Sequence, residues 1–134
     1  MILQYYMVRG DELVPRNAFP PVRENPSDAG LDLRWTPSEV SETVFKIDPG
    51  QSVLVPTGCQ FAIPHGYMLE IKNKSGIAHK RRLLVGACVV DSGYEGEVFV
   101  NLHNIGTETQ YLEPGDKVAP VSYTHLRAHE TGRN

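Results

Sequence analysis

The residues of this chain best suited to chemistry are an acid and an aromatic ring, Asp91 and Tyr94, on either side of a two-residue turn. Apolar and polar residues alternate on both flanks, within 89–98, and such alternation predicts two strands. Because Ser92-Gly93 supplies turn residues, the segment is expected to form a β-hairpin in which Asp91 ends one strand and Tyr94 begins the next. Both side chains could then face a ligand held against the hairpin. The alternative is an ordinary hairpin with a capping Asp and an exposed Tyr.

The elements that must position these residues are short strands, because turn signals recur along the chain. Strand-like alternation is clearest at 61–63, 67–71 and 98–102, and no stretch keeps an amphipathic helical period. The chain is therefore expected to be an all-β sandwich or barrel. The turn signals are Pro49-Gly50, Thr57-Gly58, Pro64-His65-Gly66, Ser92-Gly93, Asn104-Ile105-Gly106 and Pro114-Gly115.

Composition narrows the class of protein and its partners. A chain of 134 residues is one domain of ordinary size. Charged residues make up 22% and the net charge is −3, so neither a nucleic acid polymer nor a membrane surface is expected as a partner. The first residues lack a basic start and a long apolar stretch, which predicts a cytoplasmic protein without a signal peptide. Cys59 and Cys88 have no metal-ligand spacing and are expected to be buried thiols.

Three further segments belong with the one around Asp91. They read Ala-Gly-Leu-Asp-Leu at 29–33, Lys-Asn-Lys-Ser-Gly-Ile-Ala at 72–78 and Pro-Gly-Asp-Lys-Val-Ala at 114–119. Together the four resemble, in order and spacing, four of the five motifs of the homotrimeric dUTP pyrophosphatases (dUTPases). Their joint occurrence is specific where any one motif would be weak. The fifth motif, a glycine-rich C-terminal arm with Arg and Phe, is absent.

The resemblance implies a fold and an activity. The fold would be the dUTPase jelly roll, a distorted β-barrel, with three copies packed about a threefold axis. The activity would be hydrolysis of dUTP to dUMP and pyrophosphate, at sites shared between subunits. The first, second and fourth motifs would come from one subunit and the Asp91 segment from another. Mg²⁺ is the implied cofactor, held chiefly by triphosphate oxygens and water rather than by direct protein ligands.

The nucleoside side of the implied site includes two side chains and one backbone segment. Asp91 matches the family aspartate that orients the attacking water as general base and meets the sugar 3′-hydroxyl. Tyr94 matches the tyrosine that packs on the deoxyribose and leaves no room for a 2′-hydroxyl. Residues 85–89, the base-reading segment, would recognise uracil through backbone groups, with Gly86, Cys88 and the following Val90 as substrate-binding positions. Cys88 stands where glycine is frequent in the family.

The phosphate side of the implied site lies in the other motifs. Lys74, Ser75 and Gly76 form a turn expected to cradle phosphate oxygens, with lysine where many relatives have arginine. Asp32 is expected to face away from the core, and the resemblance implies that it helps to place the metal–triphosphate complex through water or neighbouring side chains. Asp116 and Lys117 are expected to give structural support. A surface turn at Lys74 and a structural Asp32 are the plainer alternatives.

The last residues depart from the family pattern. Pro120 stands where glutamine is usual, and 122–131 resembles a translated sequencing adaptor. The expected organisation is therefore a dUTPase-like domain over 1–120 and an atypical, non-native tail over 121–134, with a natural divergent tail as the alternative. His125 and His129 are four apart, but a metal site is not expected there.

Two rival functions fit the same motifs. A dCTP deaminase shares the fold, but its arginine–serine-rich segment and catalytic glutamate have no counterpart here, and Asp91-Ser92-Gly93-Tyr94 favours the pyrophosphatase. A nucleotide-binding or regulatory protein could keep the pocket and have weak turnover. The missing fifth motif keeps that second alternative open.

Overall fold

The computed structural model describes residues 4–9, 12–13, 18–23 and 30–125. It confirms the all-β fold, with one short helix. The elements are β1 (Gln4–Arg9), β2 (Glu12–Leu13), β3 (Leu31–Arg34), β4 (Phe45–Ile47), β5 (Ser52–Ala62), β6 (Tyr67–Ile71), α1 (Ser75–Lys80), β7 (Leu83–Val85), β8 (Val89–Asp91), β9 (Val98–Asn104), β10 (Gln110–Leu112) and β11 (Lys117–His125).

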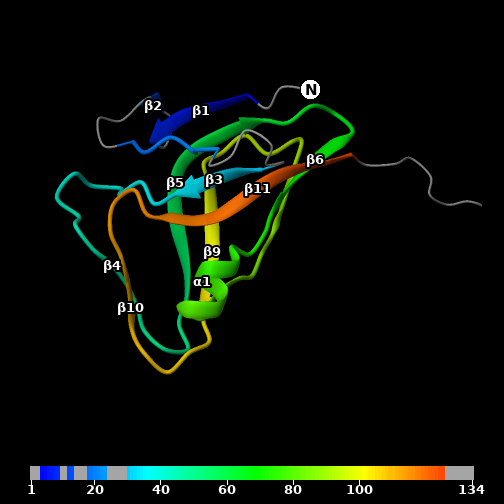
Figure 1. The fold of residues 1–134 in the computed structure, drawn as a ribbon. Helices are drawn as coiled ribbons and strands as arrows, with labels where there is room; N and C mark the ends of the chain where they lie inside the picture. Colours follow the sequence, from blue (N-terminus) through cyan, green and yellow to red (C-terminus); the bar gives the residue numbers. More distant parts are fainter. Residues whose placement is uncertain (1–3, 10–11, 14–17, 24–29, 126–134) are drawn as a thin grey trace, which may run out of the picture.

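The strands form two main sheets and a small ribbon, and all paired strands are antiparallel. One sheet has the order β2-β1-β5-β9-β7, the other β3-β11-β6-β8, and the ribbon is β10-β4. In Figure 1, β11 crosses over β5 and β9, so the strands of the two main sheets run in clearly different directions. This arrangement is the jelly-roll-like architecture expected from the sequence.

One hydrophobic core joins the three sheets. β9 shows how the period of two places residues: Val98, Val100 and Leu102 are buried, and the residues between them face outward. The core is a single cluster that draws on both main sheets and on the ribbon. Its fully buried members include Leu33, Trp35, Ile47, Val55, Leu69, Leu83, Val100, Leu102, Leu112, Val118 and Val121.

The turn expected at Thr57-Gly58 is instead a bulge inside the longest strand, β5. The register between β5 and β9 shifts between Pro56 and Cys59, and Gly58 has a φ of 69°. A glycine at positive φ suits a turn and a bulge equally, so local sequence could not separate them. The bulge is held by Glu97, whose carboxylate accepts a hydrogen bond from Gly58 N at 2.9 Å.

The hairpin expected around Asp91 is wrong in its pairing, although its turn is correct. Tyr94 N donates to Asp91 O at 3.1 Å, which closes a turn over Ser92-Gly93. However, β8 pairs with β6, and β9 pairs with β5 and β7, so the chain passes from one main sheet to the other after Asp91. Tyr94 lies in this connection, and β9 begins only at Val98.

Three smaller expectations also change. Ser75 begins the six-residue helix α1, with Lys74 at its N-cap, where a turn was expected. Cys59 is buried as expected, but Cys88 is only half-buried. β11 passes the boundary expected at 120 and continues to His125, pairing with β6 from Val121 onward. Residues 126–134 of the expected tail, including His129, lie outside the described residues.

Candidate functional site

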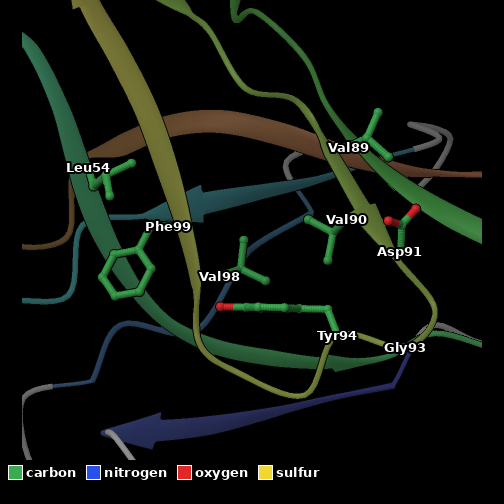
Figure 2. A pocket seen from close by; sticks show the side chains of 8 residues that line it. All are labelled: Leu54, Val89, Val90, Asp91, Gly93, Tyr94, Val98 and Phe99. Atoms are coloured by element: carbon green, nitrogen blue, oxygen red, sulfur yellow. The ribbon is translucent and has the colours of Figure 1, made fainter.

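A cavity of about 600 Å³ lies beside the expected site residues, between β8 and β9. Figure 2 shows Val90 and the Tyr94 ring projecting into it, while the Asp91 carboxylate points away from the ring. Leu54 on β5 and Phe99 on β9 line the opposite side and are largely exposed. The sequence analysis missed these two, although Phe99 is an outward-facing aromatic on an alternating strand.

The Tyr94 ring is held in place by its own loop. Its hydroxyl donates to the carbonyl of Glu97 at 2.6 Å. A Cβ on Gly96 would lie 2.7 Å from that hydroxyl and 3.0 Å from ring carbon Cζ, so only glycine leaves room for the ring. The ring nevertheless stays 45% exposed, which leaves one face open to a ligand. The hydroxyl is thus bonded to the protein, unlike that of an ordinary exposed strand Tyr.

Asp91 is exposed at the end of an edge strand. Its backbone belongs to the ladder with β6, where it lies opposite Met68. Within the described part of the chain, its carboxylate makes no hydrogen bond or ion pair. An exposed acid with no internal partner can accept a proton from water or bind a ligand without first breaking a contact.

A second group of polar residues, the Asp32 cluster, consists of Asp32, Lys74 and Lys117. Asp32 is 7% exposed, so it is buried although it points away from the main core. Lys74 Nζ lies 3.3 Å and Lys117 Nζ 4.0 Å from the same oxygen, Oδ2. The sequence prediction of an outward-facing Asp32 missed this burial, because both lysines come from distant motifs. One carboxylate between two ammonium groups leaves a net positive charge, which suits phosphate.

The residues expected to cradle phosphate surround the start of α1. Ser75 and Gly76 are exposed, and a Cβ on Gly76 would meet nothing within 4 Å. The described chain therefore gives no packing reason for a glycine at this position. The arrangement is compatible with close approach of another molecule to the backbone.

The fourth motif forms the turn that positions Lys117. Asp116 N donates to Glu113 O, and Glu113 N donates to Asp116 Oδ2, both at 2.9 Å. Gly115 has a φ of 87°, as the third residue of such a turn requires. Arg81, just after α1, lies 3.9 Å from Asp116 through Nη1. Asp116 therefore gives structural support, as expected, whereas Lys117 also reaches Asp32.

Within one chain, Asp91 and the Asp32 cluster lie far apart. They sit on β8 and β3, the two edge strands of the four-stranded sheet. Three strand steps span roughly 14 Å, and the offset of four residues along β6 adds roughly 13 Å, so the two Cα atoms are separated by roughly 19 Å. This exceeds the distance from the sugar to the phosphates of one nucleotide.

The base-reading segment, 85–89, links the two main sheets. Gly86 N donates to Asn101 O at 2.9 Å, and Cys88 O accepts from Ile71 N at 2.7 Å. A Cβ on Gly86 would collide with the side chains of Asn101 and His103. Gly86 is therefore required by packing against β9, which sequence reasoning had not foreseen.

The two thiols differ in burial. Burial raises the pKa of Cys59 to about 12 from 9.0, so this thiol stays protonated and unreactive near neutral pH. Cys88, in the base-reading segment, is half-buried.

The described residues contain neither a metal-binding cluster nor a membrane-spanning helix. No three His, Cys, Asp or Glu side chains among them cluster so as to hold a metal ion. Mg²⁺ carried by a triphosphate and its waters needs no such cluster, and the charge of the Asp32 cluster suits the phosphates that carry it. In the same part of the chain, no helix has the length and apolar character needed to cross a membrane.

Comparison with known proteins identifies the family. The sequence model of the dUTPase family matches residues 16–133. The chain belongs to the dUTPase family.

Curated relatives carry the name deoxyuridine 5′-triphosphate nucleotidohydrolase. The protein of Chlamydia muridarum is 40% identical over 95 residues, which cover 69% of this chain and 63% of the relative. That of Rhizobium leguminosarum bv. trifolii is 39% identical over 116 residues, covering 83% and 73%. The chain thus spans less than two thirds of the first of these family members.

Solved dUTPase structures share the fold. A mutant dUTPase of phage phi11 of S. aureus, described with a structural Mg(II) ion, superposes with a TM-score of 0.82. It is 20% identical, and the match covers 100% of this chain and 97% of that one. A phage 80alpha dUTPase mutant gives 0.81 at 19% identity, covering 99% and 89%. At such identity the likeness establishes the jelly-roll-like fold alone.

Proposed function

We propose that this member of the dUTPase family hydrolyses dUTP to dUMP and pyrophosphate in the cytoplasm. The observation that carries the proposal is the turn that places an unpaired carboxylate, Asp91, beside a tethered aromatic ring, Tyr94, at the rim of a cavity. The curated relatives carry the name deoxyuridine 5′-triphosphate nucleotidohydrolase, which favours hydrolysis over the alternatives of a dCTP deaminase and a weakly active nucleotide-binding or regulatory protein.

Asp91 acts as the general base. It takes a proton from a water molecule whose oxygen attacks the α-phosphorus. The bond between the α-phosphorus and the bridging oxygen breaks, and pyrophosphate leaves with the electron pair. A positioned base contributes about a hundredfold to ten-thousandfold in rate. The same carboxylate would accept a hydrogen bond from the sugar 3′-hydroxyl.

The nucleoside is selected by contacts around the cavity. The Tyr94 ring packs on the deoxyribose and excludes a 2′-hydroxyl by clash. Uracil is recognised by the backbone of Gly86, Cys88 and Val90. Cytosine is rejected because its donors and acceptors leave buried backbone groups unpaired, and such losses discriminate steeply.

The triphosphate binds at the Asp32 cluster and the start of α1. Lys74, Ser75 and Gly76 contact its oxygens, and Lys117 adds positive charge. Mg²⁺, when bound to the phosphates, neutralises their charge. Asp32 holds the two lysines and would help to place the metal–triphosphate complex. Lysine at position 74 supplies positive charge but cannot form the paired hydrogen bonds of an arginine guanidinium, so its contact with phosphate is less tightly fixed.

The complete site requires more than one copy of the chain. The Cα atoms of Asp91 and Asp32 are roughly 19 Å apart within a chain, and this separation favours a site in which the two residues that meet one nucleotide come from different copies. A homotrimer, with Asp91 of one subunit facing Lys74 of the next, meets this requirement. Leu54, Val89 and Phe99 form an apolar surface beside Asp91 suited to such packing.

Asp91→Asn tests the proposed chemistry. The variant should bind a non-hydrolysable dUTP analogue as the parent does, while pyrophosphate release falls about a hundredfold to ten-thousandfold. The parent must first show Mg²⁺-dependent release from dUTP. Equal turnover in parent and variant would remove Asp91 from the mechanism.

A mixing experiment tests the shared site. Asp91→Asn and Lys74→Ala should each be nearly inactive alone. After co-refolding, mixed trimers contain sites that combine an intact Asp91 with an intact Lys74, so activity should reappear. If sedimentation shows mixed trimers without recovered activity, the two residues do not act across one interface.

A further inference from the structure

The Asn101 side chain is the most fully bonded polar group near the proposed base site, and it touches the base-reading segment. Its Oδ1 accepts from Ala87 N at 3.1 Å and lies 3.1 Å from His103 Nε2. Its Nδ2 donates to Ser52 Oγ at 3.0 Å and to Val53 O at 3.1 Å. These two accepted and two donated hydrogen bonds use every acceptor and donor position of an amide side chain.

These partners determine which way the amide faces. Ala87 N–H can only donate, and the Val53 carbonyl can only accept, so Oδ1 must face Ala87 and Nδ2 must face Val53. His103 Nε2 can then bond to Oδ1 only if it carries the proton. Asn101 therefore has one orientation and His103 one neutral tautomer compatible with the contacts.

The position of these bonds in the chain gives them a role. The ladder between β7 and β9 ends at Val85, opposite Leu102. The backbone carbonyl of Asn101 holds the next amide, Gly86 N, and its side chain holds the one after, Ala87 N. Asn101 is thus the last attachment of the base-reading segment to β9 before the chain crosses to the other sheet.

We propose that Asn101 is a positioning residue for base selectivity: it fixes residues 86–88 at the distance from β9 at which their backbone groups can read uracil. This rests on the proposed function, because it assumes that 85–89 is the base-reading segment. Ala87 is exposed, so without the Asn101 side chain its N–H would bond to water and the segment could shift. Asn101 itself need not touch the nucleotide.

The test compares Asn101→Ala with two other variants. Asn101→Asp keeps an acceptor for Ala87 N–H, and Ser52→Ala removes one Nδ2 contact while leaving the Ala87 bond. For Asn101→Ala we expect KM for dUTP to rise about tenfold, kcat to change less than threefold, and the preference for dUTP over dCTP in kcat/KM to fall at least tenfold. Asn101→Asp should recover part of the preference, and Ser52→Ala should keep it.

Amide exchange measured by NMR gives a readout independent of activity. Ala87 N–H should lose protection in Asn101→Ala and keep it in Ser52→Ala. Unchanged Ala87 protection, or lost protection with unchanged base preference, would overturn the inference. If Asn101→Ala does not fold, Gly86→Ala takes its place, because it displaces the base-reading segment from β9 and should lower the preference for dUTP over dCTP. An unchanged preference in Gly86→Ala would also overturn the inference. If the parent neither binds nor hydrolyses dUTP, the proposed function fails, whereas exchange at Ala87 still reports on the attachment.

Discussion

The two charged regions of the molecule are the Asp32 cluster and the edge at Asp91. They differ in how far their charged side chains find partners within one chain. The Asp32 cluster is closed: its carboxylate is buried and lies near two lysines from other motifs. The edge at Asp91 is open: the acid is exposed, and nearby apolar side chains remain uncovered. A single chain thus provides partners for the Asp32 carboxylate, whereas within the described residues it leaves the edge at Asp91 open, as the proposed site between copies requires.

The largest difference expected between the two regions is in stability. Asp32→Asn removes the negative charge between Lys74 and Lys117, which then repel each other in a partly buried place. The free energy of unfolding should fall by about 2 kcal/mol. Asp91→Asn should change it by less than about 0.5 kcal/mol, because that side chain is exposed and unpaired. Denaturant titration of both variants measures this; equal losses would contradict the division into closed and open regions.

A smaller effect is expected at Tyr94, whose side chain is held at the open edge by a hydrogen bond within its own loop. Gly96→Ala places a methyl group against the ring and its hydroxyl, so the ring must move and lose its bond to Glu97. The preference for dUTP over UTP should fall roughly tenfold, about 1.4 kcal/mol, and Tyr94→Ala should lower it at least as far.

Gly93→Ala is the matched control for that loop, since a Cβ there meets nothing within 4 Å. Its nucleotide preference should stay close to that of the parent. Affinities of non-hydrolysable dUTP and UTP analogues supply the measurement. If Gly96→Ala and Tyr94→Ala both leave the ratio unchanged, Tyr94 does not read the sugar.

Local pattern predicted what depends on neighbouring residues and missed what depends on distant ones. The alternation at 98–102 identified β9 because side chains in a strand have a period of two. The turn at Ser92-Gly93 was also predicted, but the pairing of β8 with the following strand was wrong, since β9 is flanked by β5 and β7 and the partner of β8 is the distant strand β6. Burial of Asp32 depends on Lys74 and Lys117, which no local window contains. The site residues were proposed from motif resemblance, and their grouping into two separate regions emerged only from strand order.

The helix beside the closed cluster carries a small strain that can be relieved. Arg82 follows the C-cap of α1 with a φ of 57°, a left-handed conformation that costs an L-residue roughly 1 kcal/mol or more. Arg82→Gly removes this cost and adds unfolded-state entropy, for an expected net gain of about 0.5 kcal/mol. Arg82→Ala keeps the strain and should bring no gain. Thermal unfolding of both variants distinguishes loss of strain from loss of charge.

The smallest effect is expected from removing 126–134 alone, and a longer truncation serves as its contrast. Removing 121–134 deletes buried Val121 and all the pairing of β11 with β6, so the protein should not fold. Removing only 126–134 leaves β11 whole, and we expect unfolding to change by less than about 0.5 kcal/mol with dUTP hydrolysis unaltered. Trimer mass must be measured alongside, so that lost assembly is not mistaken for lost chemistry. If the shorter truncation abolished a robust activity while the trimer persisted, residues 126–134 would complete the open side of the site, and the proposal of a non-native tail would be wrong.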